Sequence, residues 1–185
     1  MNRWFVTNMI LGGILCEVPE DVLNVLRNHF KKVKKERRAD YKTKDYRQWY
    51  IQKPADNNIF STEDIDFDIW EYEDDIKIVK DFFLQYVKNI YRFRYSTMNQ
   101  THMIDYHKPH LYPRIHIPLN GATSTFTITD KNNTEKHEFL LKQGYAYVLN
   151  VLYPHTVITD DYRENCFFSF VDFANDEIKS KFFVA

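Results

Sequence analysis

The chain has 185 residues, of which 44% are hydrophobic and 17% aromatic, enough to bury one sizeable core. Its 25 basic and 26 acidic residues nearly balance and give a net charge of −1 at pH 7. The aromatic residues are not interleaved with a basic stripe, so nothing favours nucleic-acid binding. We expect one domain over residues 1–185, with no nucleic-acid partner.

The chain has two cysteines, Cys16 and Cys166, whose separation fits neither a disulfide framework nor the paired spacing of a zinc site. This usage favours a reducing compartment, and we expect a cytoplasmic protein. The apolar run before Cys16 is short and has no small-residue cleavage site, so we interpret it as a first strand. We expect no membrane association, because no segment approaches the roughly 20 consecutive apolar residues that span a bilayer.

The predicted elements begin with this strand, within residues 4–16. An amphipathic helix follows, because Pro19 stands at a first helical position and apolar residues recur at helical spacing up to Phe30. Residues 36–58 are charged, and only residues 48–51 have strand character. A second helix is predicted over residues 69–93. Its apolar stripe comprises Ile76, Val79, Phe82, Phe83, Tyr86, Val87 and Ile90.

From Phe93 onward the hydrophobic period is two, and turn signals such as Asn120-Gly121 and Gln143-Gly144 separate the segments. Short, evenly spaced strands of this kind are typical of a sandwich or jelly roll. Because the helices come first and the strands later, we predict an α+β fold with the helices packed on one face of a β core. Residues 1–92 would supply the first strand and the helices, and residues 93–185 the jelly-roll core.

Histidines gather in the second half of the chain: His102, His107, His110, His116 and His155. A mononuclear non-haem iron(II) site uses two imidazoles and usually one carboxylate, with other positions left open. A His and an Asp two positions apart on a strand point to the same side, which suits such a site. The residue two positions after His107 is Pro109, so the expected carboxylate is missing.

Four segments carry a resemblance to a known family: "MILGGILCEVPEDVLNVL", "RIHIPL", "GYAYVLNVLYPHTV" and "FFSFVDF". In this order they resemble the aspartyl/asparaginyl and free-proline hydroxylases among the 2-oxoglutarate-dependent dioxygenases. The resemblance covers nearly the whole chain. It implies a double-stranded β-helix, the cupin-like jelly-roll barrel, with Fe(II) and 2-oxoglutarate as cofactors.

The resemblance also implies metal ligands. The distal metal histidine of the family corresponds to His155, which follows Pro154 as the family pattern requires. The first ligand corresponds to His107 in one branch. In the aspartyl-hydroxylase branch, which uses two histidines without an acid, it corresponds to His116.

The family's arginine for the cosubstrate carboxylate falls on Asn165, so Arg163 is the nearest candidate and Arg114 the other. A planar guanidinium suits this task because it binds a carboxylate through two parallel hydrogen bonds. His116 could also bind the cosubstrate, beside the catalytic pair His107 and His155. An ordinary structural role for Arg163 would be a surface ion pair with a neighbouring aspartate.

The resemblance implies a hydroxylase acting on a small molecule or peptide: a free amino acid such as proline, or an Asp or Asn side chain. The alternative is a catalytically degenerate jelly roll retained as a binding or assembly protein, because the carboxylate ligand is missing and the arginine is displaced. The high aromatic content suits an interface with a protein partner or a second copy. A zinc hydrolase ranks third, since no glutamate is placed as its base.

Overall fold

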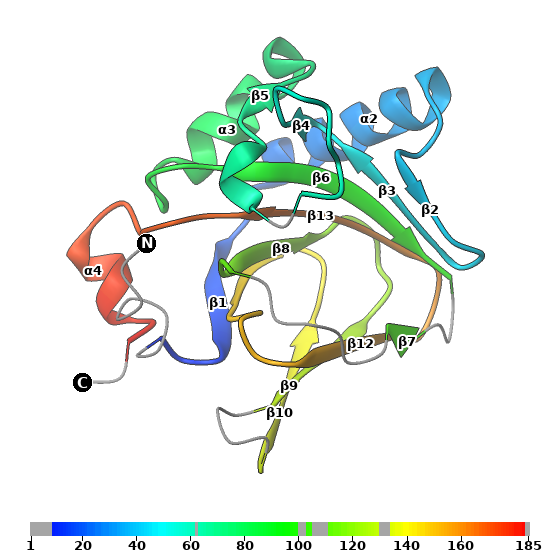
Figure 1. Cartoon of the computed structure of the whole chain (residues 1–185). Helices are drawn as coiled ribbons and strands as arrows, with labels where there is room; N and C mark the ends of the chain where they lie inside the picture. Colours follow the sequence, from blue (N-terminus) through cyan, green and yellow to red (C-terminus); the bar gives the residue numbers. More distant parts are fainter. Residues whose placement is uncertain (1–8, 62, 100–102, 105–110, 130–133, 184–185) are drawn as a thin grey trace.

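The structure is a computed structural model that describes residues 9–61, 63–99, 103–104, 111–129 and 134–183. Two β-sheets face each other in it, one of seven strands and one of four (Figure 1). The larger sheet has the order β1 (Gly12–Glu17), β11 (Tyr145–Leu149), β8 (Arg114–Pro118), β13 (Arg163–Ser169), β6 (Tyr91–Met98), β3 (Tyr46–Tyr50) and β2 (Tyr41–Lys42). The smaller sheet has the order β10 (Lys136–Leu141), β9 (Ser124–Thr129), β12 (His155–Thr159) and β7 (Met103–Ile104).

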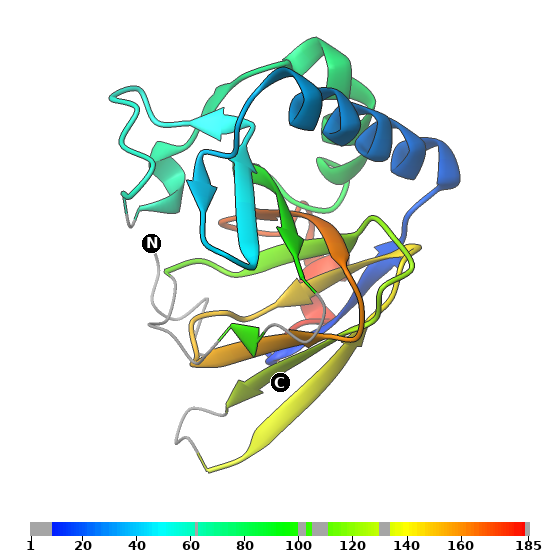
Figure 2. The same ribbon diagram turned by 90° about the vertical axis from the view of Figure 1, so that its right-hand side faces the viewer.

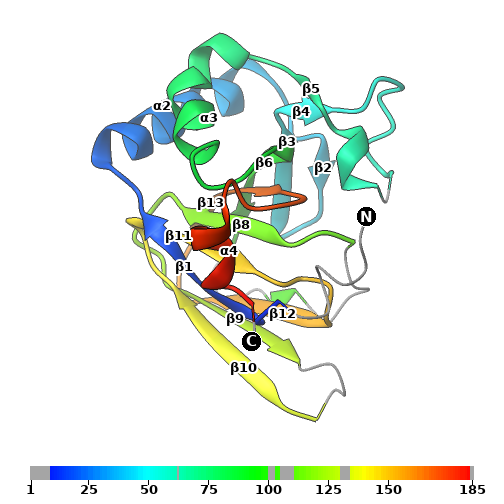
Figure 3. The same ribbon diagram turned by 90° about the vertical axis from the view of Figure 1, so that its left-hand side faces the viewer.

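The helices lie outside these sheets. Helix α2 (Glu20–Glu36) and α3 (Lys77–Phe83) cover the outer face of the seven-stranded sheet, and the four-stranded sheet lies on its other side (Figures 1 and 2). Helix α4 (Asp176–Ser180) lies near β1, where Ile10 N donates to Phe182 O at 2.9 Å (Figure 3). This α+β arrangement confirms the predicted jelly-roll, cupin-like fold with helices on one face.

The smaller elements connect these layers. A two-stranded sheet joins β4 (Gln52–Lys53) and β5 (Ile69–Trp70), and two 3₁₀ turns flank β5: η1 (Asp64–Asp66) and η2 (Glu73–Ile76). Within the described part of the chain, no helix has the length and apolar character needed to cross a bilayer.

Alternation along the strands separates two interiors. On β8, Ile115 and Ile117 point to the helices, while Arg114 and His116 point to the smaller sheet. The helix-side core is aromatic: Phe30 of α2 stacks on Tyr95 of β6 with ring centroids 4.5 Å apart. The side chains on the inner faces of the two sheets include buried charged groups, which a core built only for stability would avoid.

The first predicted helix is confirmed as α2, but the second, over residues 69–93, is wrong at both ends. This segment contains β5, η2 and α3, and β6 already begins at Tyr91. Its apolar stripe is real, because Ile76, Val79, Phe83, Val87 and Ile90 are all buried. Val87, however, forms a β-bridge with Phe173, so the stripe continues in extended chain after the helix has ended.

Candidate functional site

Three neighbouring strands of the larger sheet place polar side chains on its inner face. Phe167 of β13 pairs with Arg94 on β6 and with His116 on β8, so these three form a row across the sheet. Arg163 lies on the same face of β13, four residues from Phe167. The exposed fractions of Arg94, His116 and Arg163 are only 4%, 6% and 4%. Charged and titratable groups therefore lie inside the jelly roll.

His155, the predicted distal ligand, begins β12 in the smaller sheet and is 3% exposed. Its Nδ1 lies 2.9 Å from the carbonyl oxygen of Tyr153. Because a carbonyl only accepts, Nδ1 carries a proton, and in the neutral ring the lone pair is then on Nε2. This is the tautomer in which Nε2 can ligate a metal. The ring also stacks on Phe126, with centroids 5.3 Å apart and planes 14° apart.

His116 reaches the same phenyl ring from the opposite sheet. Its ring meets Phe126 edge to face at 5.3 Å between centroids, and stacks on Phe167 at 5.0 Å. The structure thus brings His116 and His155 into contact with the same phenyl ring. The pKa of His116 lies well below its ordinary value, chiefly because the ring is buried and secondly because of the charge of Arg163. This imidazole is therefore neutral.

The hydrogen bonding of His116 is incomplete. Its Nδ1 lies 3.3 Å from Nδ2 of Asn165, whereas its Nε2 is buried and has no hydrogen-bond partner among the residues the structure describes. Oδ1 of Asn165 also lacks a partner within that set. Buried polar atoms are usually paired, so unpaired atoms at one place indicate a missing ligand, ion or water.

The other predicted ligand, His107, lies outside the described residues, as do His102 and His110. Strand β7 ends at Ile104, which pairs with Val157, two residues from His155. Within the described ranges, no three His, Cys, Asp or Glu side chains gather as a metal site.

Arg163, the predicted cosubstrate arginine, is buried and points inward. Its Nε and Nη2 have no hydrogen-bond partner among the described residues, and it forms no ion pair with Asp160 or Asp161, both of which are described. Burial lowers its pKa from 12.5 to about 10, which Tyr46 partly opposes. The ordinary role of a surface ion pair therefore does not account for this side chain.

Arg114, the second candidate, is already neutralised. Its Nη2 lies 3.4 Å from Oδ2 of Asp64, and Asp64 also pairs with Arg92 at 2.7 Å. Asp64 accepts a further hydrogen bond from the Ser169 hydroxyl. Burial raises the pKa of Asp64, but Arg114, Arg94 and Arg92 together lower it to about 2. Asp64 is thus a buried, ionised counter-charge.

Arg94 was not identified from the sequence. Its Nη1 donates to the Tyr50 hydroxyl at 3.2 Å, and its guanidinium lies 4.3 Å from the Phe167 ring centroid. Burial raises the pKa of Tyr50, but Arg94 and Arg92 outweigh it and hold that pKa below its usual range. The Arg-x-Arg alternation of Arg92 and Arg94 was the available signal, because such a pair shares one face of a strand.

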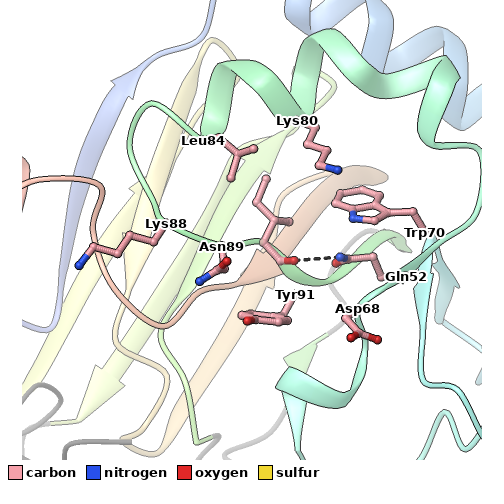
Figure 4. A pocket seen from close by; sticks show the side chains of 9 residues that line it. Gln52, Asp68, Trp70, Lys80, Leu84, Lys88, Asn89 and Tyr91 are labelled. Atoms are coloured by element: carbon pink, nitrogen blue, oxygen red, sulfur yellow. Dashed lines mark hydrogen bonds between the residues drawn. The ribbon is translucent and has the colours of Figure 1, made fainter.

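A separate pocket, shown in Figure 4, is lined by none of the residues of this site. It has a volume of about 340 Å³. Its two lysines already have acidic partners, Lys80 with Glu73 and Lys88 with Asp172. It is lined by Gln52, Asp68, Trp70, Lys80, Leu84, Lys88, Asn89, Ile90 and Tyr91.

Several solved structures are similar to this chain. An oxidoreductase of the 2OG-Fe(II) oxygenase family from Burkholderia pseudomallei is 14% identical with a TM-score of 0.56, covering 84% of this chain and 91% of that one. Hazelnut vicilin (Corylus avellana) is 13% identical with a TM-score of 0.44 over 72% of this chain. A Bacillus subtilis oxalate decarboxylase mutant is 11% identical with a TM-score of 0.47 over 74% of this chain.

The chain spans only 31% of the vicilin and 28% of the decarboxylase, but nearly all of the oxygenase. No protein-family model matches it, and no curated protein is significantly similar in sequence. At 14% identity the likeness to the oxygenase supports the double-stranded β-helix fold and nothing about the chemistry.

Proposed function

We propose that this protein is a 2-oxoglutarate/Fe(II)-dependent hydroxylase. The observation that carries the proposal is the buried, inward-facing Arg163, whose guanidinium has unpaired donors within the described residues, inside the same jelly roll as the buried imidazoles of His116 and His155. A buried cation without a counter-charge is costly, and a carboxylate ligand would remove that cost. The residues present therefore fit the cofactors that the resemblance implies.

In this proposal His155 would hold iron(II) through Nε2, together with His116 or His107. Arg163 would bind the distal carboxylate of 2-oxoglutarate. Bound together, these cofactors supply the oxidising power that places one oxygen atom of O₂ on a substrate C–H bond, with 2-oxoglutarate converted to succinate and CO₂. The substrate class is a free amino acid such as proline, or an Asp or Asn side chain of a peptide.

The protein's own residues would orient and shield the reactants. Phe126 and Phe167 pack against the imidazoles and keep water from them. Rotation of the Asn165 amide would bring its unpaired Oδ1 to Nδ1–H of His116, which fixes the tautomer that ligates through Nε2. This arrangement supports His116 as the first ligand, as in the two-histidine pattern.

The test is anaerobic addition of iron(II) and 2-oxoglutarate, which should give a weak visible charge-transfer band. We expect His155→Ala to lose this band, whereas His137→Ala keeps it, because His137 lies on β10 with a side chain that is 45% exposed. His107→Ala and His116→Ala then identify the first ligand. Succinate release in the presence of O₂ and candidate amino acids tests turnover.

A jelly roll without redox activity is the second candidate function. It is favoured by Pro109 at the carboxylate position and by the absence of a three-ligand cluster among the residues that the structure describes. If neither the band nor a thermal shift with Mn²⁺ and 2-oxoglutarate is observed, the binding or assembly role, with a protein partner or a second copy, replaces the hydroxylase.

A further inference from the structure

The buried charges of the described residues do not balance. Four arginines, Arg92, Arg94, Arg114 and Arg163, are each no more than 9% exposed. Asp64 is the only acidic side chain among the buried residues of the described ranges. Buried cations normally have a partner, so the surplus requires an explanation.

Asp64 forms ion pairs with two of the four arginines, and within the described ranges it interacts with Arg94 through charge but without an ion-pair contact. It pairs with Arg92 at 2.7 Å and with Arg114 at 3.4 Å. Arg92 also donates to two backbone carbonyls, Ser61 O at 2.9 Å and Ile59 O at 3.2 Å. Arg92 and Arg114 are therefore part of the internal framework of the fold.

Arg94 is left without an acidic partner in the part of the chain that the structure describes. Its side chain has one hydrogen bond, to the Tyr50 hydroxyl, and its Nε is buried with no partner among the same residues. Its guanidinium also contacts the Phe167 ring, with Cζ 4.3 Å from the ring centroid, which helps to hold it in place. A fixed, planar, unpaired guanidinium is prepared to bind a planar anion through parallel hydrogen bonds.

Arg94 and Arg163 begin at well-separated positions on the sheet, so each guanidinium can serve its own anion. In the strand register, Arg163 pairs with Met98, and Arg94 pairs with Phe167. These positions are four residues apart along the strand, which corresponds to roughly 13 Å. Arg94 instead shares a row with His116, two strands away, or about 10 Å between backbones.

We propose that Arg94 forms a second anion site inside the jelly roll and that it binds the carboxylate of a small acid, which is the substrate. That this acid is the substrate rests on the proposed function, whereas the anion site itself does not depend on iron or 2-oxoglutarate. Tyr50 assists, because its hydroxyl accepts from Arg94 and can donate its own proton to the bound carboxylate. The low pKa of Tyr50 and the ionised Asp64 show the same positive surroundings.

The position of Arg94 favours a small free acid over an acidic side chain in a folded protein. Arg94 is 4% exposed and Tyr50 is 4% exposed, so the ligand must enter the interior. From Arg94, a molecule the size of an amino acid extends toward His116, where the proposed metal lies. A carboxylate is also a better match than a phosphate, because it is planar like the guanidinium and carries one charge.

The experiment uses the full chain without added metal or 2-oxoglutarate. Binding of L-proline, L-aspartate and inorganic phosphate is measured by isothermal titration calorimetry. We expect at least one of the two amino acids to bind and phosphate to bind more weakly. Arg94→Met should weaken amino-acid binding about 10- to 100-fold, the loss expected for a charge-assisted pair. Arg47→Met is the control, because Arg47 lies exposed on β3.

Two further variants keep the test decisive if Arg94→Met does not fold. Arg94→Lys keeps the charge but loses the two parallel bonds, and Tyr50→Phe removes only the hydroxyl, so each should weaken binding by a smaller factor. Mn²⁺-dependent binding of 2-oxoglutarate should be unchanged in all three. Equal amino-acid binding by wild type and the Arg94 and Tyr50 variants, or tighter binding of phosphate, would overturn the assignment.

The outcomes separate the two proposals. If amino acids bind through Arg94 while no charge-transfer band forms with iron(II) and 2-oxoglutarate, the hydroxylase is wrong and the anion site remains. If the Arg94 variants lose 2-oxoglutarate as strongly as an Arg163 variant does, the two arginines serve one ligand and the second site is wrong.

Discussion

Arg163→Met tests whether the buried guanidinium is kept for a ligand or for stability. Methionine replaces the aliphatic part of the arginine side chain and carries no charge, so it keeps the apolar packing but not the guanidinium. Burial lowers the pKa of Arg163 from 12.5 to about 10. That difference corresponds to about 3 kcal/mol of unfavourable free energy for the buried charge. Because no ion pair among the described residues offsets this cost, the ligand-free variant should be more stable than the wild type.

For a chain of this length, a gain of about 3 kcal/mol corresponds to a rise in Tm of about 6–12 °C. The assay is thermal unfolding of wild type and Arg163→Met, first alone and then with Mn²⁺ and 2-oxoglutarate. At 100 times its dissociation constant, 2-oxoglutarate should stabilise the wild type by about 2.7 kcal/mol and leave the variant unchanged. The free energies of unfolding of wild type and Arg163→Met should therefore become nearly equal when the ligand is added.

A lower Tm of ligand-free Arg163→Met than of wild type would refute this reasoning, because it would mean that the guanidinium contributes to the fold. An equal ligand-induced shift in both proteins would refute the role of Arg163 in cosubstrate binding. Arg47→Met, at an exposed position on β3, should change the free energy of unfolding by no more than about 0.5 kcal/mol.

The remaining predictions concern stability. Asp64→Asn removes the counter-charge that Arg92 and Arg114 share, and it should lower the free energy of unfolding by about 3–5 kcal/mol. Urea titration measures this change. Asp74→Asn, at an exposed position, is the control and should have little effect. Burial lowers the pKa of His29 from 6.5 in the unfolded chain to about 4 in the folded protein, so the unfolded chain binds a proton more readily. The free energy of unfolding should therefore keep its full value above pH 6.5 and fall by about 2–3 kcal/mol as the pH drops to 4. His29→Gln should flatten this slope in urea titrations at a series of pH values, and an unchanged slope would contradict the assignment. Asp64, with a folded pKa of about 2, contributes stability that is present above pH 3.8 and is lost only as the pH falls toward 2, below the His29 window.

The sequence predicted the fold well because both kinds of periodicity are strong. The apolar residues that begin with Val22 predicted the helix that became α2, and the alternation in "RIHIPL" predicted β8. The same alternation places Arg114 and His116 on the inner face once the helices are assigned to the other face. The end of α3 could not be predicted, because Val87 and Ile90 are buried both in a continued helix and in the extended chain that actually forms.

The candidate site was predictable only in part. The resemblance identified His155 and Arg163, and both side chains are buried; their roles remain predictions. Asp64 could not be found, since it belongs to an acidic surface stretch and meets Arg114 only through contacts 50 residues apart in the chain. Without Asp64, the sequence does not distinguish Arg114, which has an acidic partner, from Arg94, which forms no ion pair within the described ranges.

Asp64 therefore decides which arginines can serve ligands. One carboxylate holds Arg92 and Arg114, and it does so from η1, a short turn that closes against β6 and β8. Had a second acid stood near Arg94 or Arg163, each would form an internal ion pair and the interior would be electrostatically complete. Among the described residues, Arg94 and Arg163 form no ion pair with an acid, and a buried cation without an ion-pair partner costs stability. In the proposals above, that cost is offset by two separate anionic ligands, one toward each end of β13.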